Sequence, residues 1–264
     1  MRDSFRLAGA IVQPGSRDPQ LPLDASEYSR RKRRVLFQIG LAALAALLCT
    51  GYVYNRSLDP IRAEDSFDAG RRQVVNTRYQ QALMSLDRAI QLRTGFAEAI
   101  LLRASVQSAL NKPELAIPDL NEAIRLRPND PEPYLHRAGV HLILQQFREA
   151  IVDCERAIAL DSALDRGYNL RGIALRELGQ RQQSLDDLNR AVALRPDMDN
   201  LYQRASAYQE LGQHASAITD FSRVIHFSPT NSQVYFARAK SYRELGDGPA
   251  ADRDHRMGRM IDSH

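Results

Sequence analysis

The histidines and cysteines of the chain do not fall into a spacing that makes a catalytic or metal-binding site. His136 and His141 are five residues apart, so they do not share one face of a helix. Cys49 and Cys154 are too few for a disulfide framework or a zinc site. The sequence has no H-E-x-x-H, no phosphate-binding glycine loop and no G-x-S-x-G. We therefore expect a protein that is not an enzyme, with no catalytic residues, no metal, no cofactor and no small-molecule substrate.

Charge is distributed unevenly along the chain. Residues 1–62 carry 10 Lys and Arg against 5 Asp and Glu, whereas residues 63–264 carry 26 against 27. Binding to nucleic acid needs a basic face that neutralises phosphates. The neutral larger part therefore argues against a nucleic-acid partner. The full chain has 44% hydrophobic and 26% charged residues, which is typical of a folded globular protein.

An apolar segment at residues 35–54 predicts a transmembrane helix. It has 20 residues without a charge, and a helix of that length spans roughly 30 Å, the thickness of the hydrocarbon core. Five consecutive basic residues, 30–34, precede it, while only Arg56 and Arg62 follow shortly after. The positive-inside rule then predicts a cytoplasmic N-terminus and export of everything after Tyr54. We expect a single-pass protein of a bacterial inner membrane with a periplasmic or extracytoplasmic main domain.

Other N-terminal signals fit this segment less well. A cleaved signal peptide would use the small residues around Ala45, but Leu47 and Leu48 continue the apolar run. A lipoprotein signal needs a small residue before the modified cysteine, and Leu48 precedes Cys49. A twin-arginine signal matches only in part. Residues 1–34 contain several prolines and read as a disordered basic cytoplasmic tail, and residues 55–62, with Pro60, as a linker.

The rest of the chain is a sixfold internal repeat of 33 or 34 residues. Small residues recur at positions 8 and 20 of the repeat, and position 27 is alanine in four copies. Gly179, Gly212 and Gly246, with Asn111, stand at position 15, where they permit a left-handed stop between two helices. We therefore expect a pair of antiparallel helices per repeat. The copies are 63–96, 97–130, 131–164, 165–197, 198–231 and 232–264.

This spacing resembles the tetratricopeptide repeat: a 34-residue unit, small residues at 8 and 20, a large apolar residue at 24, Ala at 27 and Pro at 32. The resemblance covers residues 63–264 and implies an all-α, right-handed superhelical solenoid of six helix-turn-helix repeats whose first helices line a concave groove. The chain departs from the common pattern at position 4, which is never Trp, and at position 7, which is Arg instead of Leu in five copies.

The arginine at position 7 is followed 16 residues later by an aspartate in five repeats, and repeat one has Ala69 and Ser85 at these two places. Because both charges are absent together, we expect a structural ion pair between the two helices of each repeat. An arginine ladder for an acidic partner is the alternative. The pairs are Arg103 with Asp119, Arg137 with Asp153, Arg171 with Asp187, Arg204 with Asp220, and Arg238 with Asp254.

The family geometry implies that positions 2, 5, 6, 9, 12 and 13 of each first helix face the groove. The groove would then change from apolar in repeats two and three to polar toward the C-terminus, and we expect it to bind a partner segment. The candidate groove residues are Phe67, Leu101, Leu102, Leu135, Leu142, Ile143, Asn169, Arg176, Tyr202, Gln203, Gln209, Phe236 and Arg243.

The resemblance favours a membrane-anchored scaffold that binds a partner protein or peptide, within an envelope-associated complex. One alternative is a chaperone-type or import receptor with repeats in the cytosol, but no three consecutive repeats supply its Lys/Asn carboxylate clamp. The other is a non-catalytic subunit of an enzyme complex. The sequence does not identify the partner.

Overall fold

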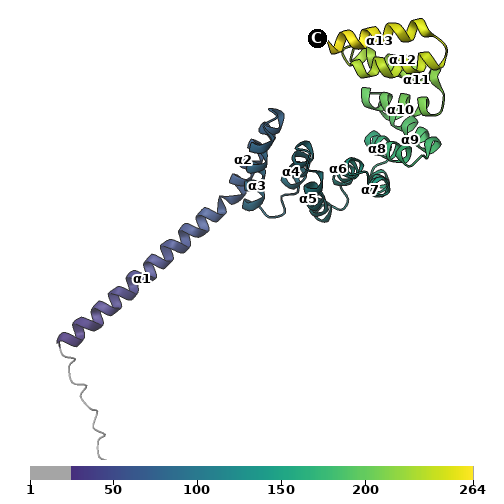
Figure 1. The fold of residues 1–264 in the computed structure, drawn as a ribbon. Helices are drawn as coiled ribbons and strands as arrows, with labels where there is room; N and C mark the ends of the chain where they lie inside the picture. Colours follow the sequence, from purple (N-terminus) through teal and green to yellow (C-terminus); the bar gives the residue numbers. More distant parts are fainter. Residues whose placement is uncertain (1–24, 264) are drawn as a thin grey trace, which may run out of the picture. The chain divides into compact units, whose positions relative to one another are not determined.

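The computed structural model describes residues 25–263, which form thirteen α-helices and no strand within that range. They follow one another in Figure 1 as α1 (Ala25–Ser57), α2 (Asp59–Val75), α3 (Tyr79–Leu92), α4 (Ala97–Ala109), α5 (Pro113–Leu126), α6 (Pro131–Ile143), α7 (Phe147–Leu160), α8 (Asp165–Glu177), α9 (Arg181–Leu194), α10 (Met198–Glu210), α11 (His214–Phe227), α12 (Ser232–Glu244) and α13 (Gly248–Asp262). The chain divides into two units, residues 1–58 and 59–264.

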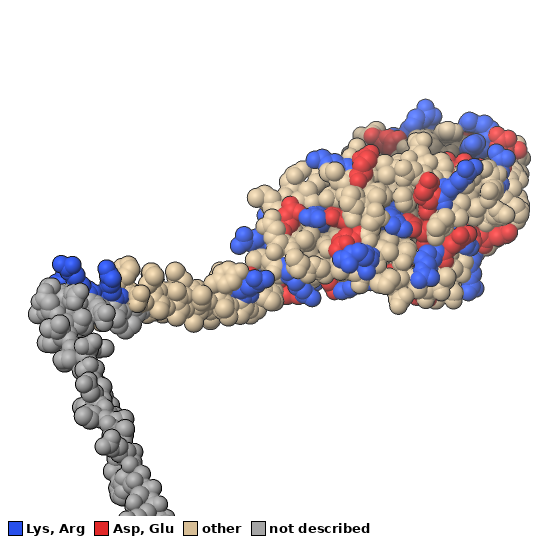
Figure 2. Space-filling view, turned by 90° about the horizontal axis from the view of Figure 1, so that it is seen from below, with Lys and Arg blue, Asp and Glu red and all other residues tan. Residues whose placement is uncertain are grey.

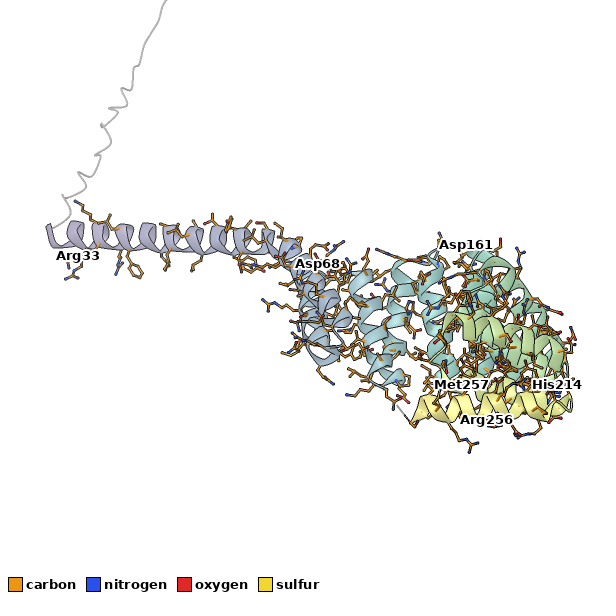
Figure 3. All side chains as sticks on the ribbon, turned by 90° about the horizontal axis from the view of Figure 1, so that it is seen from above. Arg33, Asp68, Asp161, His214, Arg256 and Met257 are labelled. Carbon is orange, nitrogen blue, oxygen red and sulfur yellow. The ribbon has the colours of Figure 1, made fainter. Side chains whose placement is uncertain are left out.

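In the first unit, α1 is longer than the predicted transmembrane segment. It begins at Ala25, inside the stretch expected to be a disordered tail. No proline lies between Pro22 and Pro60, and arginine and lysine are good helix formers. Residues 1–24 of that tail lie outside the described residues. The most apolar 18-residue window of the candidate span has a mean hydropathy of 1.9, and none of that window is buried. Figure 3 shows its side chains standing out from the helix, and Figure 2 shows an uncharged stretch along it.

The predicted linker at 55–62 is mostly helical. Helix α1 runs to Ser57 and α2 begins at Asp59, so the break is confined to Leu58. Pro60 is the second residue of α2, where its missing N–H has no intrahelical partner to lose. A proline there is compatible with the first turn of a helix as well as with a linker.

In the second unit, α2 to α13 form six consecutive helix pairs. Each helix packs on the next along the chain, and each first helix also contacts the first helix of the next pair. Within the described residues the second helices, α3 to α13 in odd numbers, make no such contact with one another. The first helices therefore lie on the inner side of the stack, and the second helices are spread apart on the outer side.

The small residues of the repeat are where the two helices of a pair approach closely. Ala82, Ala116 and Ala150 at position 20 are fully buried. At position 8, a Cβ on Gly172 would lie 2.8 Å from Cγ of Leu188 on the partner helix. A larger side chain at these places would push the helices apart.

All six turns within the helix pairs use a left-handed residue at position 15. Gly179, Gly212 and Gly246 have φ between 71° and 78°. Asn111, Thr77 and Gln145 adopt φ of 56° to 58° at the equivalent places. In the first pair, the N–H of Arg78 donates to the carbonyl of Gln73 and that of Thr77 to Val74, the hydrogen bonds of a Schellman motif. The turn geometry thus persists where the residue does not favour it.

We predict that Thr77→Gly stabilises the protein. A β-branched residue in the left-handed region costs about 1 to 2 kcal/mol. Glycine removes this strain, but part of the gain is lost because glycine makes the unfolded chain more flexible. The expected gain is about 1 kcal/mol, measured by urea unfolding. The matched control, Gly179→Ala, should lose a similar amount, and an unchanged midpoint for Thr77→Gly would contradict the prediction.

Candidate partner-binding groove

The structure brings together both members of all five Arg–Asp pairs. In each, Nε and Nη2 of the arginine donate to the two oxygens of one carboxylate, with Nε···Oδ2 distances of 2.7 or 2.8 Å. The aspartates are buried, and their hydrogen bonds raise the pKa of the arginines. Each pair joins the first helix of a repeat to its second helix.

In four of the five pairs a third donor of the arginine reaches back to the preceding repeat, which the sequence analysis missed. Nη1 of Arg103 donates to Asp87 and that of Arg137 to Asn121, both at 2.6 Å. Arg204 reaches Asn189 and Arg238 reaches Ser222. The signal is a polar residue at position 25, about 16 residues before each arginine. The guanidinium therefore connects three helices, and we call this arrangement the arginine staple.

An apolar hollow of about 360 Å³ lies on the inner side, over α2, α4 and α6. Phe67, Leu101 and Leu102 of the predicted groove line it. So do Val74 and Val75, which occupy positions 12 and 13 of repeat one and could have been found from the same rule. Val75 is 82% exposed. The charged side chains at its edge are Arg71, Glu98 and Arg127, of which the last two form an ion pair.

A second hollow of about 220 Å³ continues the first along α4 and α6. Ser105 and His136 line both hollows, and Oγ of Ser105 lies 3.2 Å from Nδ1 of His136. Ile143, which is 56% exposed, and Gly139 line the second hollow only. Together the two hollows form what we call the groove.

Ser105, His136 and Glu132 are neighbours, but their chemistry is poorly suited to nucleophilic catalysis. Burial, with a contribution from the nearby Arg166, lowers the pKa of His136 to about 4, which makes it a weak base. Glu132 lies 3.8 Å from Nε2 of His136. Ser105 donates its hydroxyl proton to the carbonyl of Leu101. We assign these residues to the wall of the groove.

Leu135 is a core residue, so its predicted place in the groove is wrong. Its side chain is fully buried in a cluster with Tyr134 and Ala157, against which Ile124, Leu160 and Leu170 also pack. Leu142 is half-buried against Ala150 and Cys154. Phe236 packs on its own second helix, against Gly258 and at 5.6 Å from the ring of His255.

Most polar residues predicted toward the C-terminal end bond to one another between neighbouring repeats. The amide of buried Asn169 donates to Asn200, and Arg176 donates to Gln203. Gln209 donates to Ser241. The ring of Tyr202 contacts that of Phe221 at 5.7 Å. Only Arg243 of this set is classed as exposed. These side chains use their hydrogen bonds within the stack.

The family model for the tetratricopeptide repeat matches residues 67–131 and 169–232. The chain belongs to the tetratricopeptide repeat (TPR) family. No curated protein sequence is significantly similar to it.

Three solved TPR-like structures show how far the similarity extends. The Cut9–Hcn1 hetero-tetramer of the APC/C has a TM-score of 0.72 at 18% identity, over 81% of this chain and 43% of that one. PilW, described as a widely conserved type IV pilus biogenesis factor, has a TM-score of 0.68 at 19% identity, over 73% and 90%. YrrB, described as a TPR protein with an unusual peptide-binding site, has a TM-score of 0.53 at 20% identity, over 67% and 91%. At these identities the similarity shows the fold alone.

The TPR core also accounts for the cysteine at position 24. Cys154 is fully buried, and burial raises the pKa of its thiol to about 12. At neutral pH it is an unreactive packing residue. Cys49 is exposed on α1.

We predict that Asp220→Ala destabilises this TPR array by about 1 to 3 kcal/mol, because it leaves the partly buried guanidinium of Arg204 without two acceptors. Changing Arg204 and Asp220 together to leucine should recover much of the loss. Thermal unfolding followed by circular dichroism measures both. A single variant that melts like the wild type would show that the pair makes no net contribution.

Proposed function

We propose that this protein is a non-enzymatic, membrane-anchored scaffold whose groove binds an apolar segment of a partner protein, within an envelope-associated complex. The observation that carries the proposal is the open apolar surface on the inner side of repeats one to three. TPR proteins are in general protein-interaction scaffolds.

The groove supports this function because its apolar side chains are open to an incoming segment. Val75 and Ile143 are largely exposed, one in each hollow, and no described residue covers them. Contiguous apolar surface of this kind usually marks a binding site. The spacing of the first helices suits a helical or extended segment laid across them. YrrB, with its peptide-binding site, is a TPR protein of similar fold.

Helix α1 supports the membrane anchor. Its apolar window is unburied, and the basic residues at 30–34 precede it while Arg56 stands in its last turn. The positive-inside rule then leads us to propose a cytoplasmic N-terminus and a TPR domain outside the cytoplasm, at a bacterial inner membrane. PilW, a pilus biogenesis factor of similar fold, is consistent with an envelope role.

We predict that Val75→Glu weakens partner capture at least tenfold, because it places a charge in the apolar hollow without removing a core contact. Full-length protein would be captured from membranes and its bound proteins compared. The matched control is Val152→Glu, a change at a side chain that is 63% exposed on the second helix α7. Both variants should keep the wild-type helical circular-dichroism signal. Equal capture by Val75→Glu and the wild type would place the site elsewhere.

We predict the topology from the basic residues 30–34, which precede the apolar stretch of α1. A periplasmic phosphatase fused after His264 should be active, and a cytoplasmic fluorescent protein at the same place should be dark. Neutralising residues 30–34 should reduce the phosphatase signal. The reverse pair of reporter results would favour a cytosolic receptor.

A further inference from the structure

A cleft of about 550 Å³ opens on the outer side of the stack, between the second helices α7 and α9 and over α8. It is larger than either hollow of the groove. The side chains that matter here are Ile151 and Glu155 on α7, Arg171 and Leu175 on α8, and Leu178 and Gln183 beside them. We call this the outer cleft.

The cleft lies at the one junction where the arginine staple is incomplete. Arg171 holds Asp187 through Nε and Nη2 like the other four arginines. Among the described residues, however, no acceptor takes a hydrogen bond from its Nη1. The equivalent place in the preceding repeat, occupied by asparagine at 121 and 189, is Glu155. No hydrogen bond or ion pair joins Glu155 to Arg171 in the described structure.

An unused donor and an unused acceptor are thus left at the same cleft. The charge of Glu155 contributes to raising the pKa of Arg171, so the two groups are near enough to interact. Ile151, Leu175 and Leu178 supply apolar surface beside them. A group that fits must offer an acceptor to Arg171, a donor to Glu155 and an aliphatic side chain to the three apolar residues.

The charges in the cleft disfavour an anionic occupant, because the cleft lining carries a net negative charge. Asp187 is already neutralised by Arg171. Asp186 and Glu155 add negative charge, and Arg148 adds one positive charge. A partner carboxylate would be repelled by the two carboxylates. A lysine or arginine side chain could bond to Glu155 but has no acceptor to offer Nη1 of Arg171, whereas a peptide backbone presents both a carbonyl and an N–H.

We propose that the outer cleft binds an extended peptide segment of a partner. A backbone carbonyl of the segment accepts from Nη1 of Arg171, a backbone N–H donates to Glu155, and one aliphatic side chain covers Ile151, Leu175 and Leu178. This site is separate from the groove, so the protein can hold two segments at once, one on each side of the stack.

The test uses the full chain in detergent micelles and a neutral probe, the blocked tripeptide acetyl-Ala-Leu-Ala-amide. Its binding is followed by NMR of the Ile151 methyl group. We expect a saturable shift of this signal with the leucine peptide and at least tenfold weaker binding of acetyl-Ala-Gly-Ala-amide. Absence of a shift, or tighter binding of a peptide with a free carboxylate, would overturn the proposal.

Three variants test whether peptide binding depends on the outer cleft itself or only on the stability of the stack. Glu155→Asn supplies the acceptor found at the other junctions, and Glu155→Ala removes the acceptor for the peptide; both should weaken binding at least tenfold. Asn121→Glu interrupts the staple one repeat earlier and should leave binding unchanged. Equal affinity in the wild type and both Glu155 variants would overturn the proposal, whatever the outcome for the groove.

Discussion

The bidentate bond between an arginine on each first helix and an aspartate on the second helix is the constraint on which most of this stack depends. A guanidinium has a fixed planar geometry, so two parallel hydrogen bonds to one carboxylate set both the distance and the rotation of the two helices. Its remaining nitrogen then points to the preceding repeat. One side chain thus relates three helices, and its repetition at position 7 gives neighbouring repeats a common geometry. Repeat one, with Ala69, has no TPR repeat before it to reach.

The two halves of the inner side differ in the extent to which their polar side chains form hydrogen bonds between neighbouring repeats. In repeats four to six, Arg176, Gln203 and Gln209 bond across repeat boundaries, which stiffens that half and leaves fewer groups for a partner. In repeats one to three the corresponding positions are mixed: Val74, Leu102 and Leu142 are apolar, whereas Asp68, Ser108 and His136 are polar. Their side chains pack only partly, which leaves the two hollows. The division follows from residue type at the same repeat positions, with the backbone unchanged.

The sequence was sufficient for the features that the 34-residue period determines. The helix pairs follow from small residues at fixed positions, and the Arg–Asp bonds follow from two charges that are absent together in repeat one. The burial of Leu135 could not be predicted in this way, because it depends on packing against side chains of the neighbouring repeats, such as Ile124 and Leu170. Pro60 led us to expect a linker where the structure has the first turn of α2. The residue type does not decide between the two, because proline is common both in linkers and in first turns of helices. The third bond made by four of the arginines is marked in the sequence by a polar residue at position 25, but that residue varies among Asp, Asn and Ser, and Glu155 at the same position forms no such bond.

The first helices contact one another and the second helices do not. When the array bends, it therefore changes shape mainly on its outer side. A change in curvature alters the inner spacing little, because those helices already touch, and alters the outer spacing most. A segment bound along the inner side restrains curvature and thereby restrains the width of every outer opening. The junction between α7 and α9 has one bond fewer to resist this change. Mechanical strain in the array would accordingly concentrate between repeats three and four, near the middle of the stack and away from its ends.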